Sequence, residues 1–259
     1  KPDLGIITNI SYAHAKNFNR ISQIAEAKAE IMNNIKSGGS VVLNMDDNFY
    51  RYHKNLALKK KLKVISFGIK NKSAMTKLIK IKKIKNKYEL LIKINGSSLA
   101  IYSQNDNQNH LYNILATLAV VNLFADIKKL NKDFFLNFKT PIGRGDISKV
   151  KLKNKEIFLV DESYNSNPLS LKTAIENYDK IKLKDSKKYL ILGDMLELGK
   201  HSIKQHKLIS KILNKTKINQ VYVVGKYIKE TFKGLKPNKK AKILNNKFSI
   251  IDLINKDLN

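Results

Sequence analysis

Cysteine is absent from the 259 residues, and this absence excludes disulfide bonds and thiolate metal sites. A reducing, cytoplasmic setting is consistent with it. The chain also lacks a long apolar run, because the longest one, Leu111–Ile127, is broken by Asn113, Thr117, Asn122 and Asp126. That run is too short and too polar to span a bilayer. No signal peptide is visible either, so we expect a cytoplasmic protein without membrane insertion.

Arginine and acidic residues are scarce, although the chain is strongly basic. Lysine and arginine together number 50 against 21 acidic residues, which gives a formal net charge of +29. One interpretation is nucleic-acid binding, and the other is a general lysine bias. Arginine, the better reader of bases and phosphates, occurs only at positions 20, 51 and 144. Because the lysines are spread along the whole chain, without an aromatic-interleaved basic strand, we expect no nucleic-acid partner.

The length suggests one large domain or two ordinary ones. In the first half, apolar runs predict strands at 4–8, 41–43 and 63–67, and helical spacing predicts helices at 20–36, from Asp46-Asp47 onward, and at 110–125. Between Lys77 and Tyr102, polar and apolar residues alternate. This alternation predicts an antiparallel meander with turns near Asn86 and Asn95-Gly96, and its lysines would lie on the solvated face.

The segment 137–147 contains one proline and two glycines and is the best linker candidate. We therefore expect two domains, residues 1–140 and 141–259. Strands and helices alternate in the second, which predicts a parallel, Rossmann-like sheet with helices on its faces. The expected strands are 156–160, 188–192, 220–224 and 241–244, and the expected helices are 168–181, 201–214, 226–233 and 247–257.

The run DESYNSNP, residues 161–168, stands between an expected strand and an expected helix. Its carboxylates, hydroxyls and amides would gather at the carboxyl end of the strand, where open α/β sheets bind ligands. Pro168 suits the first helical position, with Asn167 as the N-cap. The composition of this loop therefore allows two interpretations, a ligand site or a well-capped connection.

Four blocks resemble motifs of the Mur ligase family, and they occur in the family's order over nearly the whole chain. DESYNSNP is similar to the D-[DE]-S-Y-N-A-N-P signature of the branch that adds D-alanyl-D-alanine (MurF). The other blocks are GDMLELG (193–199) with Ser202 and His206, ITNISYAHAKNF (7–18) with IAEAKAEI (24–31), and LNMDD (43–47). The resemblance implies an α/β protein. It would be part of a Mur-ligase central ATPase domain, with a mixed sheet and an antiparallel meander, followed by a Rossmann-like C-terminal domain.

The resemblance also implies a reaction, with ATP and Mg²⁺ as cofactors. ATP would phosphorylate the terminal carboxylate of UDP-MurNAc-tripeptide, and the amine of D-Ala-D-Ala would attack the acyl phosphate. The protein would be a cytoplasmic monomer that serves peptidoglycan synthesis, and thereby cell shape and division. Another Mur-type or folylpolyglutamate ligase is one alternative, against which the loop 161–168 argues. A basic nucleic-acid-binding protein on a ligase-like fold is the alternative from a different class.

Site residues follow from the resemblance, position by position. The implied catalytic and magnesium-binding residues are His14 and Lys28, with Lys28 carbamylated; the implied ATP contacts are Asn113, Arg144 and Glu162; and Ser163, Tyr164, Asn165 and Asn167 would line the phosphate and dipeptide side. By residue type alone, His14 reads as a surface histidine and Asn113 as a first-turn polar residue. The family's H-N-x-x-N motif is not matched fully, because Asn109-His110 stands where His-Asn is usual.

Lys28 has two interpretations from helical spacing alone. On a helix at 20–36 it would lie in the middle of an apolar stripe that includes Ile24 and Met32. A lysine in that position either extends its ammonium outward to solvent or is functional. The resemblance favours the second, because burial lowers a lysine pKa and leaves a neutral amine that can capture carbon dioxide.

A phosphate-binding G-x-x-x-x-G-K-[ST] sequence does not occur in these residues. Gly193–Lys200 comes closest, but five residues rather than four separate its glycines, and His201 follows the lysine. By the resemblance, this loop and a UDP-binding domain lie upstream. We therefore expect residues 1–259 alone not to turn over.

Overall fold

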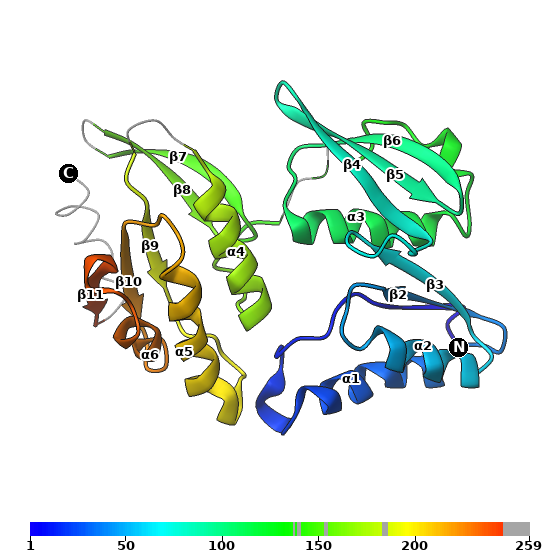
Figure 1. The fold of residues 1–259 in the computed structure, drawn as a ribbon, viewed down its shortest axis with the longest axis horizontal. Helices are drawn as coiled ribbons and strands as arrows, with labels where there is room; N and C mark the ends of the chain where they lie inside the picture. The colour runs from blue at the N-terminus through cyan, green and yellow to red at the C-terminus, as the bar shows by residue number, and fades with distance from the viewer. Residues whose placement is uncertain (137, 139–140, 153–154, 183–185, 246–259) are drawn as a thin grey trace. The chain divides into compact units, whose positions relative to one another are not determined.

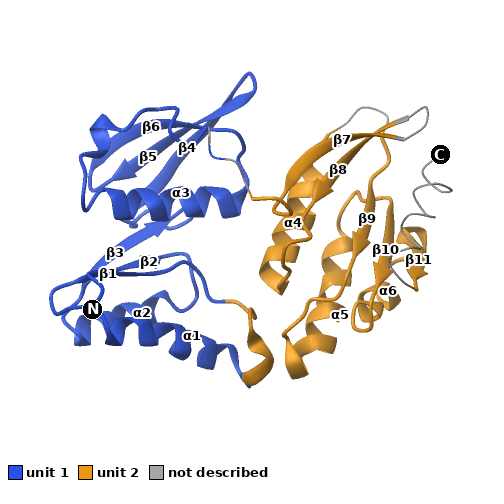
Figure 2. Ribbon diagram, turned by 180° about the vertical axis from the view of Figure 1, so that it is seen from behind, with its two compact units in different colours: residues 1–10, 18–139 blue, residues 11–17, 140–259 orange. Residues whose placement is uncertain are grey.

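The structure is a computed structural model, and it describes residues 1–136, 138, 141–152, 155–182 and 186–245 (Figure 1). The chain divides into two compact units (Figure 2). Unit 1 comprises residues 1–10 and 18–139, and unit 2 comprises residues 11–17 and 140–259. The short segment 11–17 therefore belongs by its contacts to the second unit, although both of its neighbours in sequence belong to the first.

Unit 1 contains a mixed sheet of six strands in sequential order. The strands are β1 (Leu4–Ile7), β2 (Ser40–Asn44), β3 (Lys63–Gly68), β4 (Thr76–Ile84), β5 (Lys87–Ile94) and β6 (Ser97–Ser103). Strands β1 to β4 pair in parallel, whereas β4, β5 and β6 form antiparallel pairs. The meander confirms the expectation from alternation, and the mixed sheet confirms what the resemblance implied. Asn95 and Gly96 turn the second hairpin with φ values of 46° and 92°, as a tight two-residue turn requires.

Three α-helices accompany this sheet, and all three begin or end differently from the prediction, α3 by only a few residues at each end. They are α1 (Ile21–Ala29), α2 (Tyr50–Lys59) and α3 (Gln108–Val121). The helix predicted at 20–36 is α-helical only to Ala29 and continues as a 3₁₀ turn over Glu30–Asn33. The helix predicted from Asp46 begins at Tyr50, because the Asp47 carboxylate accepts the Phe49 N–H at 2.8 Å and closes a turn before the helix.

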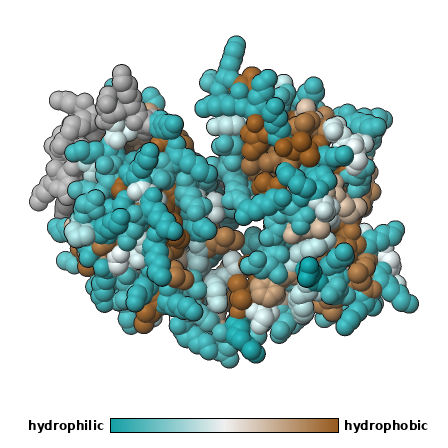
Figure 3. Space-filling model, viewed as in Figure 1, coloured by the Kyte–Doolittle hydropathy of each residue, from teal (hydrophilic) through white to brown (hydrophobic). Residues whose placement is uncertain are grey.

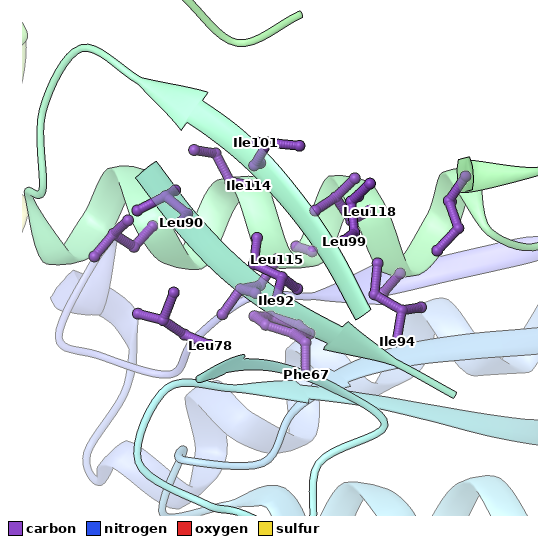
Figure 4. Close-up of a cluster of buried hydrophobic side chains, with 14 of the residues drawn as sticks. Phe67, Leu78, Leu90, Ile92, Ile94, Leu99, Ile101, Ile114, Leu115 and Leu118 are labelled. Atoms are coloured by element: carbon purple, nitrogen blue, oxygen red, sulfur yellow. The ribbon is translucent and has the colours of Figure 1, made fainter. Parts of the chain in front are cut away.

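The core of unit 1 lies between α3 and the meander (Figure 4). Alternate residues of β5, namely Leu90, Ile92 and Ile94, point to one face and are almost fully buried. They meet residues of α3 at helical spacing, including Ile114 and Leu118. Burying one such side chain stabilises the fold by about 1.5–3 kcal/mol. The opposite face of the meander carries exposed lysines, which is where the alternation predicted them.

Unit 2 contains a three-stranded parallel sheet and a separate antiparallel pair. The parallel strands are β9 (Tyr189–Leu192), β10 (Gln220–Val224) and β11 (Lys240–Leu244), in the order β11-β10-β9. The pair consists of β7 (Asp146–Leu152) and β8 (Lys155–Asp161). The helices are α4 (Pro168–Lys180), α5 (Ser202–Leu213) and α6 (Lys229–Lys233). The predicted helix at 247–257 lies outside the described residues.

The placement of β8 corrects one expectation, since the strand predicted at 156–160 was assigned to the parallel sheet. It pairs with β7 instead, and β7 itself was not predicted. The reason is local. Gly143 and Gly145 led to the prediction of a linker, whereas the alternating residues directly after them form a strand that pairs with β8. The two glycines turn the chain into β7.

Hydrophilic residues cover much of the face of the molecule that Figure 3 shows, with smaller hydrophobic areas among them. Within the described part of the chain, we find no helix with the length and apolar character needed to cross a membrane.

Candidate active site

In unit 1, polar side chains hold the segment that follows β1. Asn44 donates its side-chain N–H to the Thr8 carbonyl at 3.0 Å, and the Ile10 N–H donates to Asp47 Oδ2 at 2.8 Å. Lys28 Nζ donates to the carbonyl oxygen of the residue between them, Asn9, at 3.0 Å. The LNMDD block and Lys28 therefore meet at the carboxyl end of a parallel strand, where α/β sheets bind ligands.

Lys28 is exposed, although Ile24 and Met32, four residues before and after it, are buried. Its side chain therefore extends outward from the apolar stripe, which is one of the two outcomes that helical spacing allowed. The buried residues of α1 are Ile24, Ala25 and Ala29, and the small alanines allow this face to pack closely. Partial burial nevertheless lowers the pKa of Lys28, and the Asp47 carboxylate acts in the opposite direction. A lowered pKa enlarges the fraction of neutral amine, which is the form that carbamylation requires.

Asp46 anchors the loop after β3 and was missed as a candidate residue. Its carboxylate accepts the N–H groups of residues 69, 70 and 71 at 2.6, 2.9 and 2.7 Å, and the Tyr112 hydroxyl at 2.9 Å. Burial works to raise the pKa of Asp46, but these donors together outweigh it and leave the pKa lowered. Burial, together with Asp46, raises the pKa of Tyr112 to about 12. The LNMDD block was the signal that could have identified Asp46.

Asn113 follows Tyr112 on α3, and its side chain is exposed. Because α3 begins at Gln108, Asn113 lies in the second helical turn rather than in the predicted first turn. Its neighbour His110 is partly buried, and burial lowers the pKa of its imidazole. Among the described residues, the buried Nε2 of His110 has no hydrogen-bond partner.

In unit 2, the Gly143-Arg144-Gly145 turn packs against the DESYNSNP loop. The Tyr164 N–H donates to the Gly143 carbonyl at 3.1 Å, and the Gly145 N–H donates to the Asp161 carbonyl at 2.7 Å. Both glycines have positive φ, 78° and 89°. A Cβ on Gly143 would lie 2.9 Å from the Tyr164 nitrogen, so the close approach requires glycine. The Arg144 guanidinium lies 4.3 Å from the Tyr164 ring centroid, in cation–π range.

Three carboxylates gather beside this turn. Burial, together with the charges of Asp146 and Asp161, raises the pKa of Glu162. Hydrogen bonds from Ser163 lower the pKa of Asp161, including one from its N–H at 2.9 Å. The structure thus brings together four predicted residues of unit 2, Arg144, Glu162, Ser163 and Tyr164. An arginine next to acidic groups can bind a phosphate together with its accompanying cation.

Asn167 has a structural role that the sequence also predicted. Its Oδ1 accepts the N–H groups of Leu169 and Ser170, both at 3.1 Å, and the Ser170 hydroxyl oxygen accepts the Asn167 N–H at 3.0 Å. This is a capping box at the start of α4, with Pro168 at the first helical position. Asn165 accepts the N–H of Ser166 in the same loop. Substrate contacts of these two asparagines stay a prediction.

The block GDMLELG anchors loops in unit 2. Asp194 accepts the N–H groups of residues 226, 227 and 228 at 2.8, 2.9 and 2.7 Å. His206 is fully buried, and its Nε2 accepts the Met195 N–H at 2.9 Å while its Nδ1 contacts the Ser202 carbonyl at 2.7 Å. Nδ1 therefore carries the ring hydrogen. These hydrogen bonds fix the first residues of the loop 194–201.

His14 belongs to unit 2 by its contacts, and its Nδ1 contacts the Glu197 carboxylate. Lys28 belongs to unit 1, so neither unit alone supplies both predicted magnesium ligands. Among the described residues, no cluster of three or more metal-binding side chains occurs. Magnesium commonly takes one or two protein groups and completes its octahedron with water and phosphate oxygens. A single donor on either unit would be enough for such a partial set.

Comparisons with known proteins identify the family to which the two units correspond. Residues 1–121 match the Mur ligase middle domain, and residues 148–255 match the domain described as "Mur ligase, glutamate ligase domain". A UDP-N-acetylmuramoyl-tripeptide–D-alanyl-D-alanine ligase of Rickettsia prowazekii is 29% identical over 245 residues, which cover 93% of this chain and 52% of the relative. The chain thus spans about half the length of the curated relatives it matches.

Solved structures show the same fold. MurF from Acinetobacter baumannii superposes with a TM-score of 0.83 at 19% identity, covering 99% of this chain and 54% of that one. MurF from Thermotoga maritima, solved in complex with ADP, gives 0.78 at 24% identity, covering 98% and 56%. At these identities the likeness concerns the fold alone.

Proposed function

Because the chain belongs to the Mur ligase family, with a middle domain followed by a glutamate ligase domain, we propose that it acts as an ATP-dependent amide ligase. We propose further that it joins D-Ala-D-Ala to UDP-MurNAc-tripeptide in peptidoglycan synthesis, as a monomer in the cytoplasm. One observation carries the choice of substrate. The loop 161–168, whose residues resemble those of the D-alanyl-D-alanine-adding branch, lies against the turn that carries Arg144.

The reaction consists of two displacements. A carboxylate oxygen of the tripeptide attacks the γ-phosphorus of ATP, ADP departs, and an acyl phosphate forms. The amine of D-Ala-D-Ala then attacks the acyl carbon, phosphate departs, and the nitrogen loses a proton as the amide forms. Bound magnesium would neutralise charge on the transferring phosphoryl group.

The chain's own residues bind and orient in this scheme. Arg144 pairs with phosphate oxygens, because a guanidinium presents a fork of donors that matches them. Glu162 and Asn113 contact the nucleotide, and His14 and carbamylated Lys28 each contribute to magnesium binding. Ser163, Tyr164, Asn165 and Asn167 line the phosphate and dipeptide side. The raised pKa of Glu162 supports its assignment to the active site, because perturbed pKa values are common where a functional site brings charged groups together.

A test compares acceptors in the complete gene product. ADP release is measured with UDP-MurNAc-tripeptide and either D-Ala-D-Ala, L-alanine, D-glutamate or a diamino acid. We expect D-Ala-D-Ala to be preferred by about 100-fold or more in kcat/KM, because a site that hydrogen-bonds its substrate rejects analogues strongly. Equal or greater activity with another acceptor would overturn the assignment.

A further inference from the structure

The segment 11–17 is docked on the loop 194–201 within unit 2. The rings of Tyr12 and His201 lie 4.9 Å apart, and Ala15 is completely buried. The backbone of Lys16 approaches Gly199 so closely that a Cβ there would lie 2.8 Å from the Lys16 carbonyl oxygen. Gly199 also has a φ of 54°. This contact therefore requires glycine at 199, which gives the last residue of GDMLELG a packing role.

His14 and Glu197 face each other across this contact. His14 Nδ1 meets Glu197 Oε2, and both side chains are more than half exposed. Both residues also have left-handed backbones, with φ values of 53° and 60°. Non-glycine residues adopt this region at a conformational cost, and such residues concentrate at functional sites. On either side of Glu197, Met195 and Leu198 are each only 1% exposed and anchor the loop.

The chemistry of the pair settles which nitrogen carries the hydrogen. An ionised carboxylate can only accept hydrogen bonds, so Nδ1 of His14 must donate. In the neutral imidazole, Nε2 then keeps its lone pair, and that is the nitrogen available to bind a cation. A carboxylate behind a metal-binding histidine fixes its tautomer and orientation in this way.

We infer that Glu197 is a positioning residue that holds His14 in the Nδ1–H tautomer and presents Nε2 to a divalent cation. The cation-binding part rests on the proposed function, whereas the tautomer does not. Nothing in the resemblance to the ligase family assigned a role to Glu197. The loop 194–201 is thus the support of His14, and Asp194 and His206 hold that support in place.

Nitrogen-15 NMR of the histidine rings tests the tautomer directly. In the complete gene product at about pH 8.5, where imidazole is ordinarily neutral, we expect His14 to show a protonated Nδ1. His14→Gln assigns its signals. Glu197→Ala should shift His14 toward the Nε2–H form, and Glu197→Asp should retain part of the original signal. Glu230→Ala is the control, because Glu230 pairs with Lys233 instead. A His14 spectrum unchanged by Glu197→Ala would overturn the inference.

A second variant acts on the docking and leaves the carboxylate in place. Gly199→Val would collide with the Lys16 backbone, so we expect the same change in the His14 signals. Mn²⁺ added alone serves as the cation probe, through broadening of the His14 resonances. Glu197→Ala should weaken this binding by about 10–100-fold, as loss of an orienting partner does elsewhere.

The outcomes separate this inference from the proposed function. If Glu197→Ala abolishes the Nδ1–H tautomer but the unsubstituted protein does not ligate D-Ala-D-Ala, the proposed function is refuted and the tautomer role of Glu197 stands. Ligation with an Nε2–H tautomer in the unsubstituted protein would refute the positioning role alone. Unchanged Mn²⁺ affinity in Glu197→Ala would refute presentation of Nε2 to a cation.

Discussion

At the scale of single residues, Lys28 combines an exposed side chain with a lowered pKa. Its ammonium contacts the Asn9 carbonyl, so its charged end is partly desolvated although the residue reaches solvent. Carbamylation needs both properties, because carbon dioxide must reach the amine and the amine must be neutral. Exposure together with a lowered pKa is therefore compatible with the proposed role of Lys28.

On the proposed function, Lys28→Ala should abolish most ligase activity, by about 100-fold or more, because it would remove the carbamate oxygens proposed to bind magnesium. Added short carboxylic acids should restore part of it by supplying the lost oxygens. ADP release in the complete gene product is the measurement. Lys54→Ala, at an exposed lysine of α2, is the matched control and should remain active. Near-normal turnover of Lys28→Ala without rescue would show that Lys28 has no catalytic part.

Glu162 makes stability depend on pH in a defined direction. Its pKa is raised from the ordinary value of 4.5, so the folded protein holds this proton to higher pH than the unfolded chain does. Stability from this group is therefore complete below pH 4.5 and is lost as pH rises through the raised pKa. Glu162→Gln removes the effect. It should raise the melting temperature at neutral pH by about 1–2 °C, because solvent partly screens this half-buried carboxylate, and by less in acid.

Glu162→Gln should also lower ligase activity. Higher stability together with lower activity is typical of a substitution at a functional residue. Thermal unfolding followed by circular dichroism between about pH 4 and pH 8 measures the stability part. Glu176→Gln on α4 is the control, because Glu176 pairs with Lys172 and lies outside the acidic group around Glu162. The predicted direction would be contradicted if Glu162→Gln stabilised the protein less at neutral pH than in acid, each measured against the unsubstituted protein at the same pH.

At the scale of elements, the two units use the same device to fix a loop. In unit 1, Asp46 follows β2 and accepts the three N–H groups that come after Gly68, at the end of β3. In unit 2, Asp194 follows β9 and accepts the three N–H groups that come after Gly225, beyond the end of β10. A Cβ on Gly225 would lie 2.6 Å from the Asp194 carboxylate, and one on Gly68 would lie 3.1 Å from that of Asp46.

Removing either aspartate should release the loop it holds. Asp46→Ala and Asp194→Ala should each destabilise the fold by about 2–4 kcal/mol, because each leaves three N–H donors without their acceptor. Amide hydrogen exchange should accelerate at 69–71 in the first variant and at 226–228 in the second. Asp133→Ala and Glu230→Ala are the controls, since both residues are in surface ion pairs. Unchanged exchange at these amides would contradict the anchoring role.

Local patterns predicted most of the elements, and tertiary contacts account for what they missed. Alternation predicted the meander because β4 to β6 have one buried and one exposed face. The loop 161–168 and its cap at Asn167 also follow from local rules. The role of Asp46 depends on residues 69–71, and the contact of His14 depends on Glu197, 183 residues away. No pattern within a short window encodes such pairings.

At the scale of the whole molecule, the net charge of +29 would suit a polyanion partner, but it is spread over both units. We expect binding to random single-stranded RNA to be weak, independent of sequence and lost between about 50 and 200 mM salt, as for non-specific charge attraction. Gel shifts at increasing salt measure this. Tight binding that persists at the higher salt and prefers one sequence would favour the nucleic-acid alternative over the ligase.

The central claim is that the protein activates a carboxylate through an acyl phosphate and then forms an amide. The most direct measurement uses UDP-MurNAc-tripeptide with oxygen-18 in its terminal carboxylate, together with ATP, magnesium and D-Ala-D-Ala. One labelled oxygen should appear in the released phosphate for each amide formed, because that oxygen leaves with phosphorus when the amine attacks. Amide formation with unlabelled phosphate, or phosphate release without amide formation, would contradict the account.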